Sequence, residues 1–125
     1  MSTITVSPPN SIIFLYDQSN PSIEVPVYIS GEVVAANITC ISVGTLSAAD
    51  GETTITLTDD VQGIEDIGML TFDGLLQLPG SELSVCSSHN EKLLTMQLPA
   101  FEARIRIFVN DDREPDNIIF QAQPA

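Results

Sequence analysis

The chain has 125 residues, enough for one domain with its own core, and carries 17 Asp and Glu against four Lys and Arg, a net charge of −13. Its apolar content of 43% argues against disorder. A surface this negative repels nucleic acid and anionic membranes, which excludes both as partners.

The first ten residues, MSTITVSPPN, contain no positive residue and no apolar run. We therefore expect neither a secretory signal nor a transit peptide, and a cytoplasmic location. No stretch of the chain approaches the roughly 20 apolar residues that a membrane-spanning helix needs.

Apolar and polar residues alternate along most of the chain, which is the pattern of β-strands, and they do not recur at helical spacing. In residues 23–29 the alternate apolar side chains share one face, and Pro26 on the other face indicates an edge strand or a bulge. In residues 101–109, the clearest strand, Phe101 and every second residue after it would face the core. The other predicted strands are residues 12–16, 37–43, 53–58, 67–72, 83–86, 94–98 and 118–121.

Turn residues separate these strands, at Asp50-Gly51, Asp73-Gly74, Pro79-Gly80 and Ser88-His89-Asn90. Eight or nine short strands with this spacing are typical of a sandwich or a barrel. We predict one all-β domain over residues 1–125, an antiparallel β-sandwich of about eight or nine strands.

Negative charge is distributed unevenly along the chain. Residues 1–91 contain twelve Asp or Glu and no Lys or Arg, whereas all four cations lie in the last 34 residues. Such a surface attracts basic proteins, for example a nuclease. Carboxylates of this chain could occupy the basic cleft of a nuclease in the way that DNA phosphates do. Acidic composition also favours solubility or reflects adaptation to salt, and this alternative stays open.

Candidate contact residues for a basic partner follow from this charge. The densest cluster lies in the loop-like segment TDDVQGIEDIG. The first candidates are Asp59, Asp60, Glu65 and Asp66. Asp50, Glu52 and Asp73 come next, if the neighbouring strand presents them on the same face.

Catalytic and metal-binding patterns are weak. His89 lies near Ser87 and Ser88, but no nucleophile elbow accompanies them, so we interpret His89 as a solvent-facing turn residue and expect no enzyme activity. Cys40 and Cys86 lie in apolar strand-like stretches, which predicts buried apolar side chains; whether they pair in a disulfide stays open.

Calcium binding is an alternative function. The segment VNDDREPDN places four carboxylates within six positions, and oxygen-rich loops between strands bind calcium in some sandwiches. The candidate ligands are Asp111, Asp112, Glu114 and Asp116. A solvated turn, in which Asp and Asn satisfy their own backbone, explains the same residues.

The C-terminal half shows a sequence of features that is similar to a known family. A short strand, LSVCSS (residues 83–88), is followed by a turn ending at Lys92 and by LLTMQLP (residues 93–99). A long strand, EARIRIFV (residues 102–109), and a closing strand, NIIFQA (residues 117–122), complete it, and Ala49-Asp50-Gly51 is a second point of likeness. These features resemble the competence protein J type of inhibitor, which is partnered with a DNA-entry nuclease. The resemblance implies a β-sandwich that inhibits a nuclease, and it carries over no binding residue.

Two function classes therefore remain beside calcium binding. The leading hypothesis is an inhibitor or immunity-type protein that masks the basic active-site surface of a nuclease or toxin. The alternative is a structural or assembly module, in which exposed apolar residues such as Tyr28 or Phe108 belong to an oligomer interface. The sequence gives neither the partner's identity nor the oligomeric state.

Overall fold

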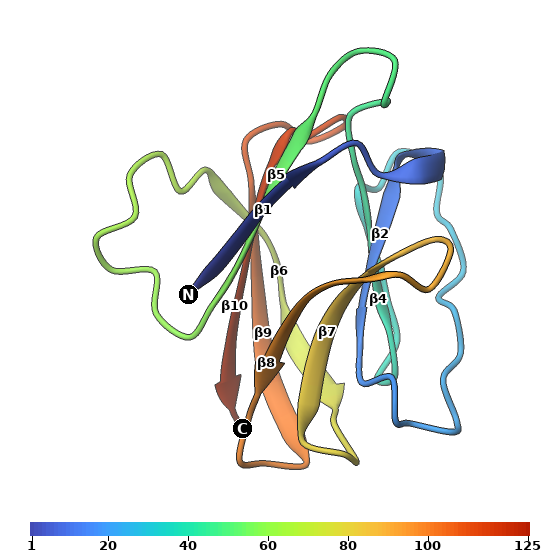
Figure 1. The fold of residues 1–125 in the computed structure, drawn as a ribbon, viewed down its shortest axis with the longest axis vertical. Coiled ribbons are helices and arrows are strands. Elements are labelled where there is room, and N and C mark those ends of the chain that lie inside the picture. Colours follow the sequence, from blue (N-terminus) through green and yellow to red (C-terminus); the bar gives the residue numbers. More distant parts are fainter.

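A computed structural model describes all 125 residues as two five-stranded β-sheets packed face to face (Figure 1). Sheet I has the strand order β1 (Ser2–Val6), β5 (Thr53–Thr58), β10 (Asn117–Pro124), β9 (Glu102–Val109) and β6 (Met69–Gln77). Sheet II has the order β3 (Val34–Ala36), β4 (Ile41–Gly44), β2 (Ile12–Tyr16), β7 (Glu82–Ser87) and β8 (Lys92–Gln97). The predicted all-β sandwich is confirmed, with ten strands instead of eight or nine; β1 and β3 were not predicted.

All neighbouring strands are antiparallel except β5 and β10, which run parallel with Ile55 opposite Ile118. The only helical segment is a 3₁₀ turn, Pro9–Ser11, before β2. No helix has the length and apolar character that crossing a bilayer would require.

The core lies between the sheets and contains 18 buried apolar residues. In β9, Ala103, Ile105, Ile107 and Val109 point into it and are fully buried, as the alternation predicts. Each large apolar side chain buried in this way stabilises the fold by about 1.5–3 kcal/mol.

The prediction for Phe101 was wrong. Its side chain is 75% exposed, because the residue belongs to the turn before β9 and not to the strand. The Phe101 carbonyl accepts a hydrogen bond from the backbone N–H of Leu78 at 2.7 Å, which fixes the backbone and leaves the ring in solvent.

Two long connections cross the outer faces of the sandwich. Because β2 and β3 are both antiparallel to β4, they run parallel, so residues 17–33 must return along the whole length of sheet II. Figure 1 shows this segment on the right, outside β2 and β4. Residues 59–68 similarly connect β5 to the parallel strand β6 across sheet I, and they project on the left.

The prediction of a strand at residues 23–29 was wrong. This segment forms no ladder, and its alternate apolar side chains Val25, Val27 and Ile29 face solvent. Pro26 removes one backbone donor. Side chains replace the ladder at Glu24: its N–H donates to Thr39 Oγ1 at 3.0 Å, and its carbonyl accepts from Asn37 Nδ2 at 2.9 Å.

One of the four predicted turns was also wrong. Asp73 and Gly74 lie inside β6, which pairs with β9 along its whole length apart from a bulge at Leu70–Phe72. The other three turns are confirmed by backbone hydrogen bonds, from Asp50 to Ser47, from Ser81 to Leu78 and from Asn90 to Ser87.

Candidate functional site

Two acidic loops meet at one end of the sandwich. The first, residues 45–52, connects β4 to β5, and the second, residues 110–116, connects β9 to β10. The Leu46 N–H donates to the Pro115 carbonyl at 3.0 Å, and the Thr54 N–H donates to the Asp116 carbonyl at 2.8 Å. These two bonds place the first loop directly beside the second.

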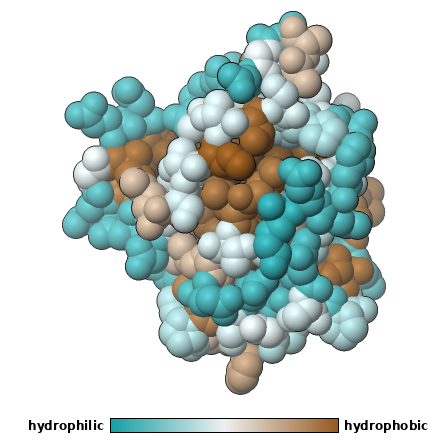
Figure 2. All heavy atoms as spheres, in the orientation of Figure 1, coloured by the Kyte–Doolittle hydropathy of each residue, from teal (hydrophilic) through white to brown (hydrophobic).

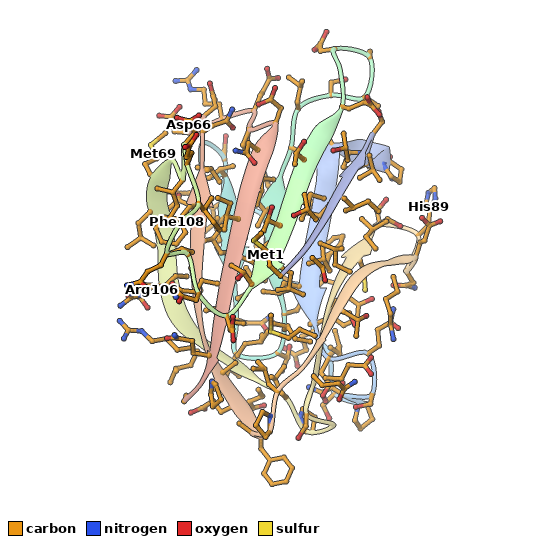
Figure 3. The ribbon with its side chains drawn as sticks, turned by 60° about the vertical axis from the view of Figure 1, so that its left-hand side comes forward. Met1, Asp66, Met69, His89, Arg106 and Phe108 are labelled. Atoms are coloured by element: carbon orange, nitrogen blue, oxygen red, sulfur yellow. The ribbon has the colours of Figure 1, made fainter.

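Two further segments bring carboxylates to the same end. The 59–68 connection joins β6 at this end, where Gly68 lies against the Val109 carbonyl. Asp66, two residues before Gly68, has a left-handed φ of 53°. Figure 3 shows Asp66 and Met69 at this end, beyond Phe108 and Arg106. Glu32 also lies at this end, because it lines one shallow hollow together with residues of the β9–β10 loop.

We call this region the acidic end and define it by eight carboxylates, all on exposed residues. They are Glu32, Asp50, Glu52, Asp66, Asp111, Asp112, Glu114 and Asp116. None of them takes part in an ion pair, and Arg113 is the only cation among them. The three other cations pair with acids elsewhere, so the negative charge of this end is almost uncompensated.

The β9–β10 loop holds its shape through its own side chains. Backbone N–H groups of Glu114 and Arg113 donate to Asp111 Oδ1, at 2.9 and 2.8 Å, and they hold the pKa of Asp111 below its usual range. Asn110 Oδ1 accepts from the N–H of Asp116 at 3.1 Å. The carboxylate of Asp111 therefore serves the backbone as the solvated-turn interpretation predicts, and no three His, Cys, Asp or Glu side chains are arranged to hold a metal.

The cluster predicted from TDDVQGIEDIG is divided by the fold. Asp59 and Asp60 follow the last residue of β5, while Asp50 and Glu52 precede its first, so about 20 Å of strand separates the two pairs. Gln121 and Gln123 donate to the Asp59 carbonyl at 3.3 and 3.2 Å and fix the start of the crossing. Glu65 is exposed on the crossing, and Asp66 reaches the acidic end.

Asp73 differs from the other predicted contacts because its charge is compensated. Arg104 donates to both of its carboxylate oxygens, at 2.9 and 2.8 Å, and Arg106 Nε lies 3.5 Å from Oδ2. The Arg104 hydrogen bonds lower the pKa of Asp73. This residue lies on the outer face of β6 and adds little to the field of the acidic end.

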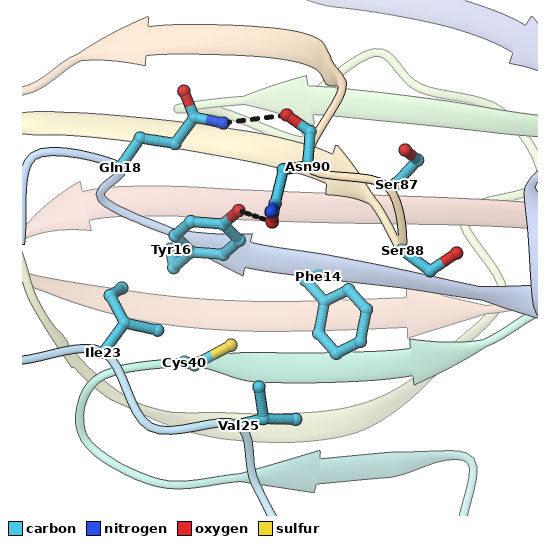
Figure 4. Close-up of a pocket in the computed structure, with 9 residues that line it drawn as sticks. All are labelled: Phe14, Tyr16, Gln18, Ile23, Val25, Cys40, Ser87, Ser88 and Asn90. Carbon is cyan, nitrogen blue, oxygen red and sulfur yellow. Dashed lines mark hydrogen bonds between the residues drawn. The ribbon is translucent and has the colours of Figure 1, made fainter.

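A groove of about 450 Å³ lies on the outer face of sheet II, between β2 and the 17–33 segment (Figure 4). Its polar groups bind one another: Tyr16 Oη donates to Asn90 Oδ1 at 3.1 Å, and Gln18 Nε2 donates to the Asn90 carbonyl at 3.3 Å. Burial raises the pKa of Tyr16 to about 12. The groove thus lacks a set of free polar side chains aimed at one point.

The two cysteines flank β2 and are both free and fully buried, as predicted for apolar side chains. Cys86 lies opposite Phe14 on one side of β2, while Cys40 precedes Ile41, the partner of Leu15 on the other side. Two strand spacings separate them by about 10 Å, beyond the roughly 7 Å that a disulfide spans. Burial raises the pKa of Cys40 to about 12.

His89 is exposed in the β7–β8 turn, as predicted, and Figure 3 shows it on the side of the molecule away from Asp66 and Arg106. Ser87 Oγ accepts hydrogen bonds from the backbone N–H groups of His89 and Glu91, at 3.2 and 3.3 Å. The serine therefore stabilises the turn, and its contacts are not those of a nucleophile paired with a base.

Asp17 is a structural residue that the sequence analysis missed. It is fully buried, and its carboxylate accepts from the N–H and hydroxyl of Ser19, at 2.9 and 2.6 Å, and from the N–H of Gly80 at 2.6 Å. Burial alone would raise its pKa, but these hydrogen bonds outweigh burial and lower it. The Asp-x-Ser spacing after an apolar strand, a common turn pattern, was the available signal.

Fold and site together define a class: a two-sheet β-sandwich that presents uncompensated acidic loops at one end. No family model and no curated protein sequence matches the chain. Among solved structures, it is similar to ComJ from Bacillus subtilis, described as an inhibitor of the DNA-degrading activity of NucA. The TM-score is 0.72 at 11% identity, over 100% of this chain and 96% of ComJ.

A second structure, described as crocagin biosynthetic gene J, matches with a TM-score of 0.54 at 14% identity, over 98% of this chain and 94% of its own. At such low identity these similarities establish the fold. The fold expected from the resemblance to the competence protein J type is thereby confirmed, over the whole chain and not only its C-terminal half.

Proposed function

We propose that this protein is a non-catalytic inhibitor that binds a basic, DNA-degrading nuclease through its acidic end. The observation that carries the proposal is the gathering of eight exposed carboxylates, from four separate segments, with one cation and no ion pair among them. The shared fold with ComJ, an inhibitor of a nuclease, supports it.

The inhibitory step needs no chemistry from this chain. A nuclease binds DNA phosphates with Lys and Arg, and carboxylates at the ends of the β4–β5 and β9–β10 loops can occupy those positions instead. Complementary charge also accelerates encounter above the roughly 10⁵–10⁶ M⁻¹s⁻¹ of neutral partners. Because exposed charges are screened over about 8 Å at physiological salt, association must weaken as ionic strength rises.

Among the predicted contact residues, we place Asp50, Glu52 and Asp66 at the centre of this interface, together with the β9–β10 loop. Asp59, Asp60 and Glu65 extend it along the crossing of sheet I. Asp73 contributes least, because Arg104 and Arg106 already neutralise it.

The test uses the immobilised chain to retain proteins from lysate of its source cells at low ionic strength. We expect the column to retain a basic polypeptide that mass spectrometry identifies as a nuclease, and we call it the retained nuclease. Its cleavage of plasmid DNA should stop when the purified chain is added. If the only retained proteins have no nuclease activity, or if the chain leaves cleavage unchanged at micromolar concentration, the proposal fails.

A further inference from the structure

The 17–33 connection carries the most exposed apolar stretch of the molecule, residues 25–29. Four of its five residues are large exposed hydrophobics, with Val27 83% and Tyr28 75% exposed. Single exposed apolar residues are ordinary, but a contiguous group marks an interaction surface. A separate group of hydrophobic side chains is visible at the middle of the face shown in Figure 2, between the two sheets.

This apolar segment, residues 25–29, is held in place and is not part of a sheet. The side chains of Asn37 and Thr39 bind the backbone of Glu24 just before it. After it, the Glu32 N–H donates to the Ile29 carbonyl at 3.1 Å, and Gly31, with φ of 87°, closes the turn. The segment is therefore anchored at both ends, and its large apolar side chains are exposed, although Val25 also lines the groove over β2.

The apolar segment adjoins the acidic end. Tyr28, Glu32 and Val33 form one wall of a hollow of about 410 Å³, and the β9–β10 loop residues 112–114 form the other wall. Glu24 lies at the far end of the segment. The apolar residues are thus bordered by carboxylates, with Arg113 as the only nearby cation.

We infer that the apolar segment and the acidic end form one continuous surface, in which Tyr28 anchors an apolar patch on the same basic partner. This inference rests on the proposed function and extends it. An apolar centre bordered by charge is the usual build of a protein interface, and Tyr is frequent among the residues that dominate binding energy. The patch on the partner carries apolar side chains among Lys and Arg.

Charge favours a basic partner protein over a second copy of this chain as the molecule that covers the apolar segment. Each molecule has a net charge of −13, and the segment borders its most negative region. Pairing two such segments would bring two acidic ends together, and like charges across an interface cost several kcal/mol. A basic partner with apolar side chains on the same surface would interact favourably with both the apolar segment and the acidic end.

The test compares Tyr28→Ser and Val27→Ser with Phe101→Ser, by surface plasmon resonance with the retained nuclease. Phe101 is a matched control, since it is an aromatic residue with the same 75% exposure in the turn that opens β9, at the opposite end of the strand from the β9–β10 loop. We expect Tyr28→Ser to weaken binding about tenfold or more, mainly through faster dissociation, with an unchanged dependence on salt. Phe101→Ser leaves binding unchanged.

Three outcomes would overturn the inference. Tyr28→Ser and Val27→Ser could bind as tightly as Phe101→Ser, while removal of acidic-end charges weakens binding; the proposed function would then stand without the apolar anchor. Light scattering could show a dimer that Tyr28→Ser dissociates, which would assign the segment to a second copy. If neither kind of variant affects binding, the proposed function fails as well. Unchanged melting temperatures establish that the variants are folded.

Discussion

The backbone N–H of Leu46 donates to the carbonyl of Pro115 at 3.0 Å, and this bond joins the two loops that make the acidic end. Pro115 is buried although its neighbours Glu114 and Asp116 are exposed. The loop is therefore anchored at its middle while its carboxylates project into solvent. A charge arrangement fixed in this way loses less conformational entropy on binding than a flexible acidic tail would.

Replacing Asp17 should destabilise the fold. Asp17→Ala leaves Ser19 and the Gly80 N–H without their acceptor, and the free energy of unfolding should fall by about 2 kcal/mol in urea titrations. Asp60→Ala is the matched control, because Asp60 makes a similar bond to the N–H of Gln62 in an exposed loop. A loss for Asp17→Ala no larger than that of Asp60→Ala would show that the buried carboxylate is not a structural anchor.

Asp17 should also make stability depend on pH. Its folded pKa is lowered, so the stabilisation is present above the unfolded value of about 3.9 and is lost as pH falls through the folded pKa. In urea unfolding between pH 6 and pH 3, the free energy of unfolding should fall less steeply with decreasing pH for Asp17→Asn than for the wild type. Some loss persists in the variant, because the pKa values of Asp73, Glu82 and Asp111 are lowered too. Identical slopes would contradict this assignment.

The path of the 59–68 connection should depend on Gly68. A Cβ at this residue would meet the backbone of Val109, and its φ of 84° disfavours other residues, so Gly68→Ala should cost about 2 kcal/mol. Gly63→Ala, with φ of 81° but open space, should cost about 1 kcal/mol. Thermal melts measure both. Equal costs would mean that the crossing does not pack against the end of β9.

Alternation along the strands predicted most of the fold. The buried series Ala103 to Val109 follows it residue by residue, because every inward position of β9 lies in the core between the sheets. The same rule fails for residues 23–29, where the pattern is equally regular. There Pro26 and the path outside sheet II prevent a ladder, and no second layer covers the apolar face.

Sequence proximity was a poor guide to the acidic site. Asp59 and Asp66 belong to one loop but mark its two ends, since the loop crosses a whole sheet. Asp66 instead lies at the same end of the sandwich as Asp50 and Asp111, which are distant from it in the chain. The strand order β1-β5-β10-β9-β6 brings these segments to one end of the molecule, and long-range pairing of that kind leaves no local signal in the sequence. The net negative charge itself was predictable from composition.

The thiols should be unreactive in the folded protein. Both cysteines are buried, and a pKa of about 12 leaves almost no Cys40 thiolate at neutral pH. A thiol reagent at pH 8 should label neither residue in the native state and both in urea. Rapid labelling of native protein, or a disulfide under oxidising conditions without loss of structure, would contradict the placement of Cys40 and Cys86 on opposite sides of β2.

The most direct measurement is the rate of association with the retained nuclease as a function of ionic strength. One variant combines Asp50→Asn, Asp112→Asn and Glu114→Gln, and its control is Asp73→Asn, which removes a compensated charge. We predict that the triple variant associates about tenfold more slowly at low salt, with a flatter salt dependence, while the control behaves like the wild type. An association rate that is equal in all three proteins would contradict recognition through the acidic end.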